Sequence, residues 1–187
     1  MAFVRTVLGD IDPGELGVTD AHEHVIIAGG KPVELYPDLL LTDVDKAVAE
    51  LEIAKGYGLR SLVDAMPIDC GRDVLRLAEV SRRSGINIVA PTGLHAAHWY
   101  RDDHWSLAMA SDDISELFAA DVTEGIDAND HRGQTVERTA VRAGVIKVGG
   151  SGEFPTERDA RVFEAAAAAQ LKTGVPILTH TEGGRFA

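Results

Sequence analysis

Residues 145–181 read VIKVGGSGEFPTERDARVFEAAAAAQLKTGVPILTHT, and this stretch contains the pattern that decides the fold. Two short apolar runs rich in β-branched residues, 145–149 and 175–181, flank a segment with helical spacing from Thr156 to Lys172. Its alanine run is a strong helix former, and Gly174 suits the position after a helix. A strand, a helix and a second strand in this order are typical of a parallel α/β fold.

The same alternation extends over the rest of the chain. Strands are predicted at 17–26, 60–65, 86–92, 145–149 and 175–181, after an N-terminal hairpin over 3–8 that turns through residues 12–14. Helices are predicted from Thr42 to Gly56 or Gly58, from about Arg72 to Gly85, from Ser111 to Val122, and from Thr156 to Lys172. We find no internal repeat and no linker, so residues 1–187 are predicted to form a single α/β domain or part of one.

The charge balance disfavours nucleic acid and anionic membranes as partners. The chain has 187 residues, with 30 Asp and Glu against 18 Lys and Arg, which gives a net charge of −12. Residues 102–130 are rich in acids and contain no Lys or Arg. We interpret them as a solvated helix face and loop, with a docking site for a basic partner as the alternative. The expected partner is a small-molecule substrate.

The features that report on compartment indicate a reducing, aqueous environment. Cys70 is the single cysteine, so no internal disulfide can form. The N-terminus lacks the basic and apolar regions of a signal peptide. The apolar run at 165–169 is far shorter than the roughly 20 residues of a membrane span. We therefore expect a cytoplasmic protein without a transmembrane segment.

Three groups of residues near predicted strand ends could carry chemistry. His22 and His24 are two apart on one strand, so their imidazoles lie on the same face and can converge on one ion. Lys147 is a lone cation in an apolar strand, where burial favours the neutral, nucleophilic amine. His180 lies at the end of the last predicted strand. In a parallel barrel the active site lies at the C-terminal ends of the strands, so the coincidence favours a shared site.

Each of these residues also has a structural interpretation. The two histidines of the first strand could lie on a wet strand face. Lys147 could extend its amine to solvent or pair with a buried acid. His180 could be a hydrogen-bonded structural residue. The residues alone leave these alternatives open.

Five blocks of the sequence resemble the phosphotriesterase-like branch of the amidohydrolase superfamily. They are GVTDAHEH at 17–24, IDCGRDV at 68–74, IVAPTGL at 88–94, RAGVIKV at 142–148 and TGVPILTHT at 173–181. The resemblance covers essentially the whole chain. It implies the N-terminal part of a (β/α)8 TIM barrel of the metal-dependent hydrolase type.

The resemblance also implies a centre of two divalent metal ions. His22 and His24 would bind the buried ion, His180 the more exposed one, and a carbamate formed on Lys147 by carbon dioxide would bridge both. Zinc is the expected metal, with cobalt, manganese or iron as alternatives. A metal-bound hydroxide would attack a lactone, another carboxylic ester or a phosphotriester. Homodimerisation is expected from the resemblance alone.

The family pattern includes two residues that this sequence lacks, a histidine from the sixth strand and an aspartate from the eighth. The sequence stops at Ala187, after the fifth predicted strand. Either it is part of a longer enzyme or it is a truncated product. We favour the longer enzyme, because an unclosed barrel exposes unpaired strand edges and apolar surface.

Histidine and aromatic residues cluster after the third predicted strand, at His95, His98, Trp99, Tyr100, His104 and Trp105. The resemblance implies that His95 lines the leaving-group pocket and contacts the substrate. For the cluster as a whole, a hydrogen-bonded surface loop is favoured over a third-metal or general-base role. Residues 127–138 are polar and aperiodic, so we predict a surface loop to which no function is assigned.

The leading hypothesis is a cytoplasmic hydrolase with two metal ions that acts on a lactone or carboxylic ester in preference to an organophosphate. One rival is a barrel that keeps the ligands but only binds a small molecule. Another is an inactive fragment whose open sheet edge pairs with another chain. Metal-dependent turnover distinguishes the hydrolase from the binding protein, and aggregation on size exclusion would reveal the fragment.

Overall fold

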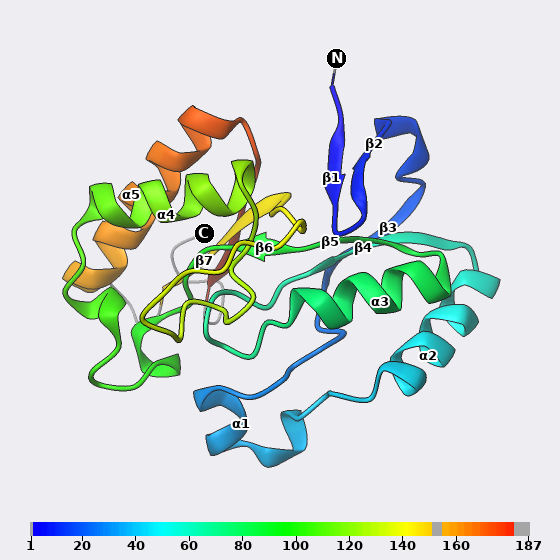
Figure 1. Ribbon diagram of the computed structural model, residues 1–187, viewed down its shortest axis with the longest axis horizontal. Coiled ribbons are helices and arrows are strands. Elements are labelled where there is room, and N and C mark those ends of the chain that lie inside the picture. Colours follow the sequence, from blue (N-terminus) through cyan, green and yellow to red (C-terminus); the bar gives the residue numbers. More distant parts are fainter. Residues whose placement is uncertain (1, 151–154, 182–187) are drawn as a thin grey trace.

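Parallel strands form the centre of the computed structural model, which describes residues 2–150 and 155–181 (Figure 1). In chain order these strands are β3 (Val18–Glu23), β4 (Leu59–Asp64), β5 (Asn87–Val89), β6 (Pro91–Thr92), β7 (Val145–Gly150) and β8 (Ile177–Thr181). β4 pairs with β3 and β5, while β7 pairs with β6 and β8, all in parallel. Only Ala90 separates β5 from β6, so the segment 87–92 joins the two sheets. Spatial neighbours thus follow sequence order, as in consecutive strands of a (β/α)8 barrel, and the predicted fold class is confirmed.

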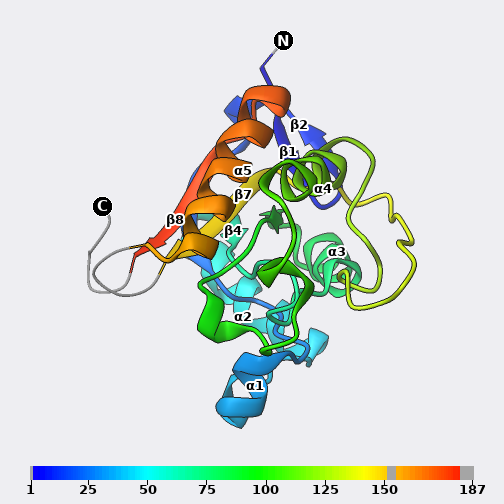
Figure 2. The same ribbon diagram turned by 90° about the vertical axis from the view of Figure 1, so that its left-hand side faces the viewer.

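Helices connect successive parallel strands and cover the outside of the sheet. They are α1 (Lys31–Leu35), α2 (Val44–Gly56), α3 (Val74–Ser84), α4 (Ser111–Thr123) and α5 (Glu157–Thr173). α2 packs against α3 and α4 packs against α5, and Figures 1 and 2 show the two pairs on opposite sides of the molecule. Among the described residues, no helix combines the length and apolar character that crossing a bilayer requires.

The helix boundaries lie close to their predicted positions. α2 begins after Asp43, whose carboxylate accepts a hydrogen bond from the Lys46 N–H, so the prediction of Thr42 as cap is wrong by one residue. α3 begins after Asp73 in the same way. Aspartate caps a helix as well as threonine does, and the spacing of apolar residues does not distinguish adjacent caps. α3 and α5 end before Gly85 and Gly174, as predicted.

The start of α5 carries a reciprocal cap that the start of α4 lacks. The Asp159 N–H donates to the Thr156 hydroxyl, and the Thr156 N–H donates to the Asp159 carboxylate. Ser111 is instead the first residue of α4, and the cap residue Ala110 makes no side-chain cap bond. We expect Thr156→Ala to lower the free energy of unfolding by about 1 kcal/mol, and Ser111→Ala to change it by less than about 0.5 kcal/mol. Urea unfolding followed by circular dichroism measures both, and equal losses would contradict the capping role of Thr156.

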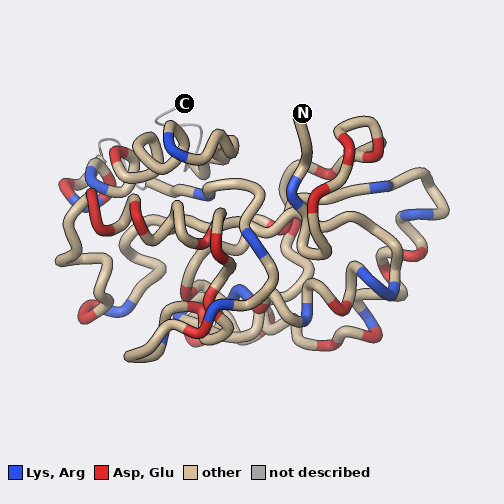
Figure 3. Tube along the Cα trace, turned by 45° about the horizontal axis from the view of Figure 1, so that its top comes forward, with Lys and Arg blue, Asp and Glu red and all other residues tan. Residues whose placement is uncertain are grey.

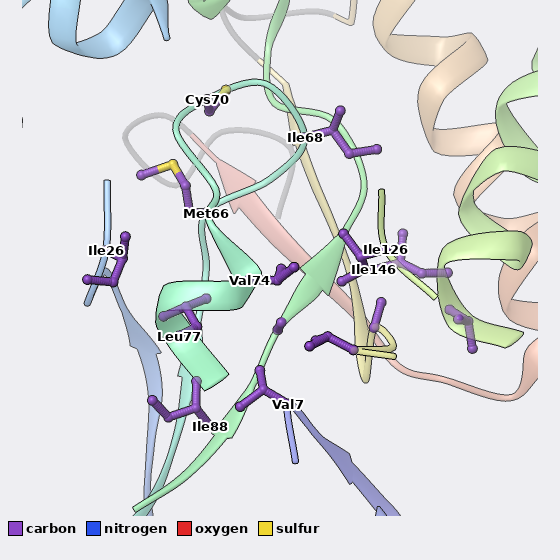
Figure 4. Packing of buried hydrophobic residues seen from close by; sticks show 14 of the residues in the cluster. Val7, Ile26, Met66, Ile68, Cys70, Val74, Leu77, Ile88, Ile126 and Ile146 are labelled. Carbon is purple, nitrogen blue, oxygen red and sulfur yellow. The ribbon is translucent and has the colours of Figure 1, made fainter. Parts of the chain in front are cut away.

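An N-terminal hairpin packs onto the core, with a turn different from the predicted one. β1 (Val4–Thr6) pairs antiparallel with β2 (Gly9–Ile11), so the chain turns at residues 7–8 and not at 12–14. Residues 13–15 form a 3-10 turn capped by Asp12, because the aspartate side chain accepts from the Gly14 N–H. The Val7 N–H donates to the Ile88 carbonyl over 2.8 Å, and both side chains belong to the buried cluster in Figure 4.

A buried ionic network connects the segment just before α3 with α4 and with the loop after α4. Asp121, Asp127 and Asp130 are all buried. Along the chain as a whole, acidic and basic residues are interspersed (Figure 3). The Arg72 Nε donates to Asp130 over 2.8 Å, and its Nη1 donates to Asp121 over 3.4 Å. Arg138 also donates to Asp121. Two predictions are therefore wrong: the acids of 102–130 are not all solvated, and 127–138 is not simply a surface loop.

The physical reason lies in tertiary contacts that spacing does not reveal. Burial raises the pKa of Asp130 to about 6, even though the charge of Arg72 opposes this rise. Burial also acts to raise the pKa of Asp121, but a hydrogen bond from His131 and the charge of Arg72 outweigh it, and the pKa is lowered. The basic partners of these acids lie within the same chain, at Arg72 and Arg138.

Candidate active site

One cavity of about 320 Å³ brings together the five side chains that were predicted as metal ligands or substrate contact. It is lined by His22 and His24 from the end of β3, His95 from the loop after β6, Lys147 from β7 and His180 from β8. These positions lie at or near the carboxyl ends of the strands, where a parallel barrel builds its active site. The described structure thus places the five residues at one location.

The two histidines of β3 present neutral imidazoles to this cavity. Their ring centroids are 5.4 Å apart in an edge-on arrangement. Burial, with the nearby charges of His22 and Lys147, lowers the pKa of His24 to about 4. Burial and Lys147 lower the pKa of His22 as well. The Nδ1 of His24 is buried and has no hydrogen-bond partner within the described part of the chain.

Lys147 is a buried amine held against a histidine. Its strand is buried along its whole length, and only 1% of the residue is exposed. Burial lowers its pKa to about 8, so a substantial share of the amine is neutral near physiological pH. The Nζ lies 3.2 Å from the Nε2 of His22, and no carboxylate within residues 2–150 and 155–181 forms an ion pair with it. Neither structural interpretation of this lysine, access to solvent or pairing with an acid, is found there.

Two glycines allow the loop after β6 to lie directly on β7. Gly93 has φ of +113°, and a Cβ at this position would lie 1.9 Å from the Lys147 carbonyl oxygen. A Cβ on Gly149 would lie 2.9 Å from the Nδ1 of His95. The Gly149 N–H donates to the Leu94 carbonyl over 3.1 Å, which fixes the loop in this position. The absence of side chains here sets the distance between His95 and the strand that bears Lys147.

His95 lies beside His180 with a defined tautomer. The ring centroids of the two histidines are 4.7 Å apart. Burial, with the charges of His180 and Lys147, lowers the pKa of His95 to about 3, so its ring is neutral. The Ala96 N–H donates to the His95 Nδ1 over 2.8 Å, and the proton of the neutral ring therefore lies on Nε2. His95 is thus a hydrogen-bond donor through Nε2.

Apolar residues that the sequence did not single out form much of the cavity wall. Trp99 belonged to the predicted aromatic cluster and Cys70 to the block at 68–74, whereas the others belong to no motif quoted above: Ile27, Pro32, Leu39, Ala65, Met66 and Pro67. Tyr100 and His104 are buried, so the prediction of a surface loop is wrong for these two residues. His104 and Trp105 line a neighbouring cavity instead.

The cavity contains part of the donor set of a zinc site, namely histidine nitrogens. Within the described ranges, no group of three or more His, Cys, Asp or Glu side chains has an arrangement that could hold a metal ion. The cavity combines histidines with a buried lysine, and the unpartnered Nδ1 of His24 is a donor left available there. Neutral imidazoles are ligands for zinc, and a carbamate on Lys147 would add the anionic oxygens that these histidines lack.

Comparison with known proteins gives a consistent result. The family model described as the phosphotriesterase family matches residues 2–186. A phospho-furanose lactonase of Mycoplasmopsis agalactiae is 37% identical over 99% of this chain, and an aryldialkylphosphatase of Saccharolobus solfataricus is 31% identical over 91% of it.

Solved structures agree in fold. An amidohydrolase from Mycoplasma synoviae superposes with a TM-score of 0.91 at 35% identity, covering 96% of this chain and 52% of that one. A lactonase from Listeria monocytogenes superposes with a TM-score of 0.84 at 27% identity, covering 96% and 57%. The chain spans about half the length of the curated relatives it matches, since it covers 53% of the lactonase and 51% of the aryldialkylphosphatase. The family model matches residues 2–186, and the strand order agrees with the N-terminal part of such barrels. The chain therefore belongs to the phosphotriesterase family.

Proposed function

We propose that the protein is a hydrolase that cleaves the ester bond of a lactone or another carboxylic ester, with phosphotriesters as the alternative substrates. The observation that supports this most is the shared cavity, which is lined by four histidines and a desolvated lysine, with two of the histidines, His95 and His180, in ring contact. Relatives named as a lactonase and as an aryldialkylphosphatase support the same two substrate classes.

We further propose that two divalent cations bind in this cavity, with zinc expected and cobalt, manganese or iron as alternatives. His22 and His24 would hold one, His180 the other, and a carbamate on Lys147 would serve both. The neutral amine forms the carbamate when its nitrogen adds to the carbon of carbon dioxide and one N–H proton is released. Its lowered pKa of about 8 supports this addition, because only the unprotonated amine has a free electron pair. When bound, such cations acidify a water molecule and polarise the ester carbonyl.

The protein's own side chains have further roles in this proposal. The neutral His95 offers its Nε2 proton as a donor, which suits an oxygen that gains negative charge as the ester bond breaks. The apolar wall formed by Trp99, Leu39 and Met66 excludes water from the substrate, which strengthens these polar contacts. Hydrolysis then adds one water across the ester, giving a carboxylate, a hydroxyl group and one proton.

Removal of metal provides the direct test. We expect the intact protein, as its host makes it, to contain close to two equivalents of a divalent transition metal by elemental analysis. Dialysis against a chelator is expected to abolish hydrolysis in a panel of lactones, aryl esters and phosphotriesters, because no side chain of the cavity replaces the lost charge. Return of zinc, cobalt or manganese is expected to restore it.

Two outcomes would contradict the proposal. Hydrolysis that persists at full rate after chelation would exclude the metal-dependent mechanism. Saturable binding of a lactone that survives chelation and yields no product would favour a non-catalytic binding barrel.

A further inference from the structure

We propose that Arg158, in the first turn of α5, is a positioning residue that holds His95 in place over the cavity. The inference rests on the proposed function, because it concerns the donor that faces the reacting ester. Arg158 does not line the cavity, and none of the sequence patterns singled it out. It lies behind the loop that carries His95.

The guanidinium group of Arg158 connects three parts of this loop. Its Nη1 donates to the main-chain carbonyl of His95, and its Nη2 donates to the Ser106 hydroxyl over 3.1 Å. Its Cζ lies 5.0 Å from the ring centroid of Tyr100, over the ring face. Arginine suits this position because its planar group donates in fixed directions while it stacks on an aromatic ring.

The main-chain N–H of His95 is held as well. It donates to the Tyr100 hydroxyl over 2.7 Å, and that hydroxyl donates to the Ile68 carbonyl over 3.0 Å. The carbonyl of His95 is therefore bonded to Arg158 and its N–H to Tyr100, and these two side chains stack on each other. The Ala96 N–H then sets the tautomer of the ring. The imidazole is oriented through its backbone, with its Nε2 proton left for the cavity.

Arg158 is buried, and its hydrogen-bonding groups are only partly satisfied by the described residues. Its side chain is 6% exposed, and its Nε has no hydrogen-bond partner within the described residues. Among the described acids it pairs with Asp159, whose Oδ1 lies 3.6 Å from Nη1 and is itself without a hydrogen-bond partner in that part of the chain. A buried charge with incomplete partners usually reduces stability. The presence of Arg158 at this position is explained by its contacts with the His95 carbonyl, Ser106 and Tyr100.

A matched pair of variants tests the assignment. Arg158→Ala removes the bond to the His95 carbonyl, whereas Arg161→Ala removes a bond of the same kind, from Arg161 to the Leu107 carbonyl over 2.7 Å. In the metal-loaded intact protein, Arg158→Ala is expected to lower kcat and kcat/KM by the same factor, about 10–100-fold. Arg161→Ala is expected to stay within about twofold of wild type. Arg158→Lys, which keeps the charge but not the fork, is expected to recover part of the loss, and millimolar guanidine to restore part of the Arg158→Ala activity.

A second measurement does not depend on turnover. Imidazole ¹⁵N spectra of the metal-free protein report the tautomer of His95. Wild type and Arg161→Ala are expected to show a protonated Nε2 and an accepting Nδ1, while Arg158→Ala is expected to show averaged shifts. Thermal unfolding of each variant identifies general loss of the fold, and Arg158→Lys replaces Arg158→Ala if the latter does not fold.

The outcomes separate the two proposals. If wild type hydrolyses no ester with any metal, the proposed function fails, and the ¹⁵N spectra alone decide whether Arg158 positions His95. If wild type is active but Arg158→Ala matches Arg161→Ala in kcat and in the His95 spectrum, the positioning role is overturned while the proposed function stands. An equal loss in both variants, without rescue by guanidine, would also overturn it.

Discussion

Replacement of Lys147 by alanine is expected to reduce ester hydrolysis by about 10³-fold or more, because it removes the amine on which the proposed charged carbamate would form. The amine lies 3.2 Å from the His22 imidazole and is almost completely buried, so no neighbouring side chain can take its position. Steady-state kinetics with a lactone and elemental analysis of bound metal measure the effect. Loss of metal together with loss of kcat is the expected result.

Two controls make this prediction specific. Lys172→Met removes a half-exposed lysine on α5 that pairs with Glu116 on α4, away from the cavity, and is expected to leave kcat unchanged. In Lys147→Ala, added propionate is expected to recover part of the activity, because its carboxylate resembles the proposed carbamate in charge and shape. Full activity of Lys147→Ala without any additive would refute the role of the lysine, and rescue by an amine instead of a carboxylate would refute the carbamate.

Replacement of Arg72 by methionine is expected to lower the free energy of unfolding by about 3–5 kcal/mol. The substitution leaves Asp121 and Asp130 buried without their shared partner, and it removes the donor to the Pro91 carbonyl, 2.7 Å away. Urea unfolding followed by circular dichroism measures the change. Such a loss is a large fraction of the stability of an ordinary domain.

The matched control for this prediction is Arg76→Met. Arg76 lies four residues further along, in α3, and pairs with Asp73, but its side chain is 43% exposed. Its loss is expected to change the free energy of unfolding by less than about 1 kcal/mol, as for an exposed ion pair. Similar losses at Arg72 and Arg76 would mean that the buried network contributes no more than a surface pair.

The strands and helices could be predicted because local patterns specify them. Runs rich in β-branched residues mark β5, β7 and β8, and glycines mark the ends of α3 and α5. The observed helix boundaries differ from the predicted ones by one or two residues where two possible capping residues are adjacent, as at Thr42 and Asp43. The N-terminal hairpin was placed with the wrong turn because Asp12-Pro13-Gly14 is a strong turn signal that the structure uses for a 3-10 turn instead.

The contacts that hold distant segments together could not be predicted in this way. Asp121 and Asp130 belong to a stretch without any base, and their partner Arg72 lies far upstream in the chain. His22, His24, Lys147 and His180 were found because histidine and lysine are unusual on apolar strands, whereas His95 was assigned from the family resemblance. Arg158 carries no such signal, since an arginine in the first turn of a helix is ordinary until Tyr100 and the His95 carbonyl are seen beside it.

The strand order described above has a consequence for how the protein could be altered. The histidines and the lysine that face the cavity are carried by β3, the loop after β6, β7 and β8, and β3, β6 and β7 are each followed by a separate connecting segment. A new segment can therefore be grafted after one of these strands without moving the groups on the others. The segment after β6 is the exception. Gly93 and Gly149 allow the backbone of this segment to lie against β7. An engineered variant must therefore keep the main-chain conformation of the segment, while its other side chains can be changed. Libraries aimed at new ester substrates should therefore keep these two glycines and diversify the apolar wall around Leu39 and Met66.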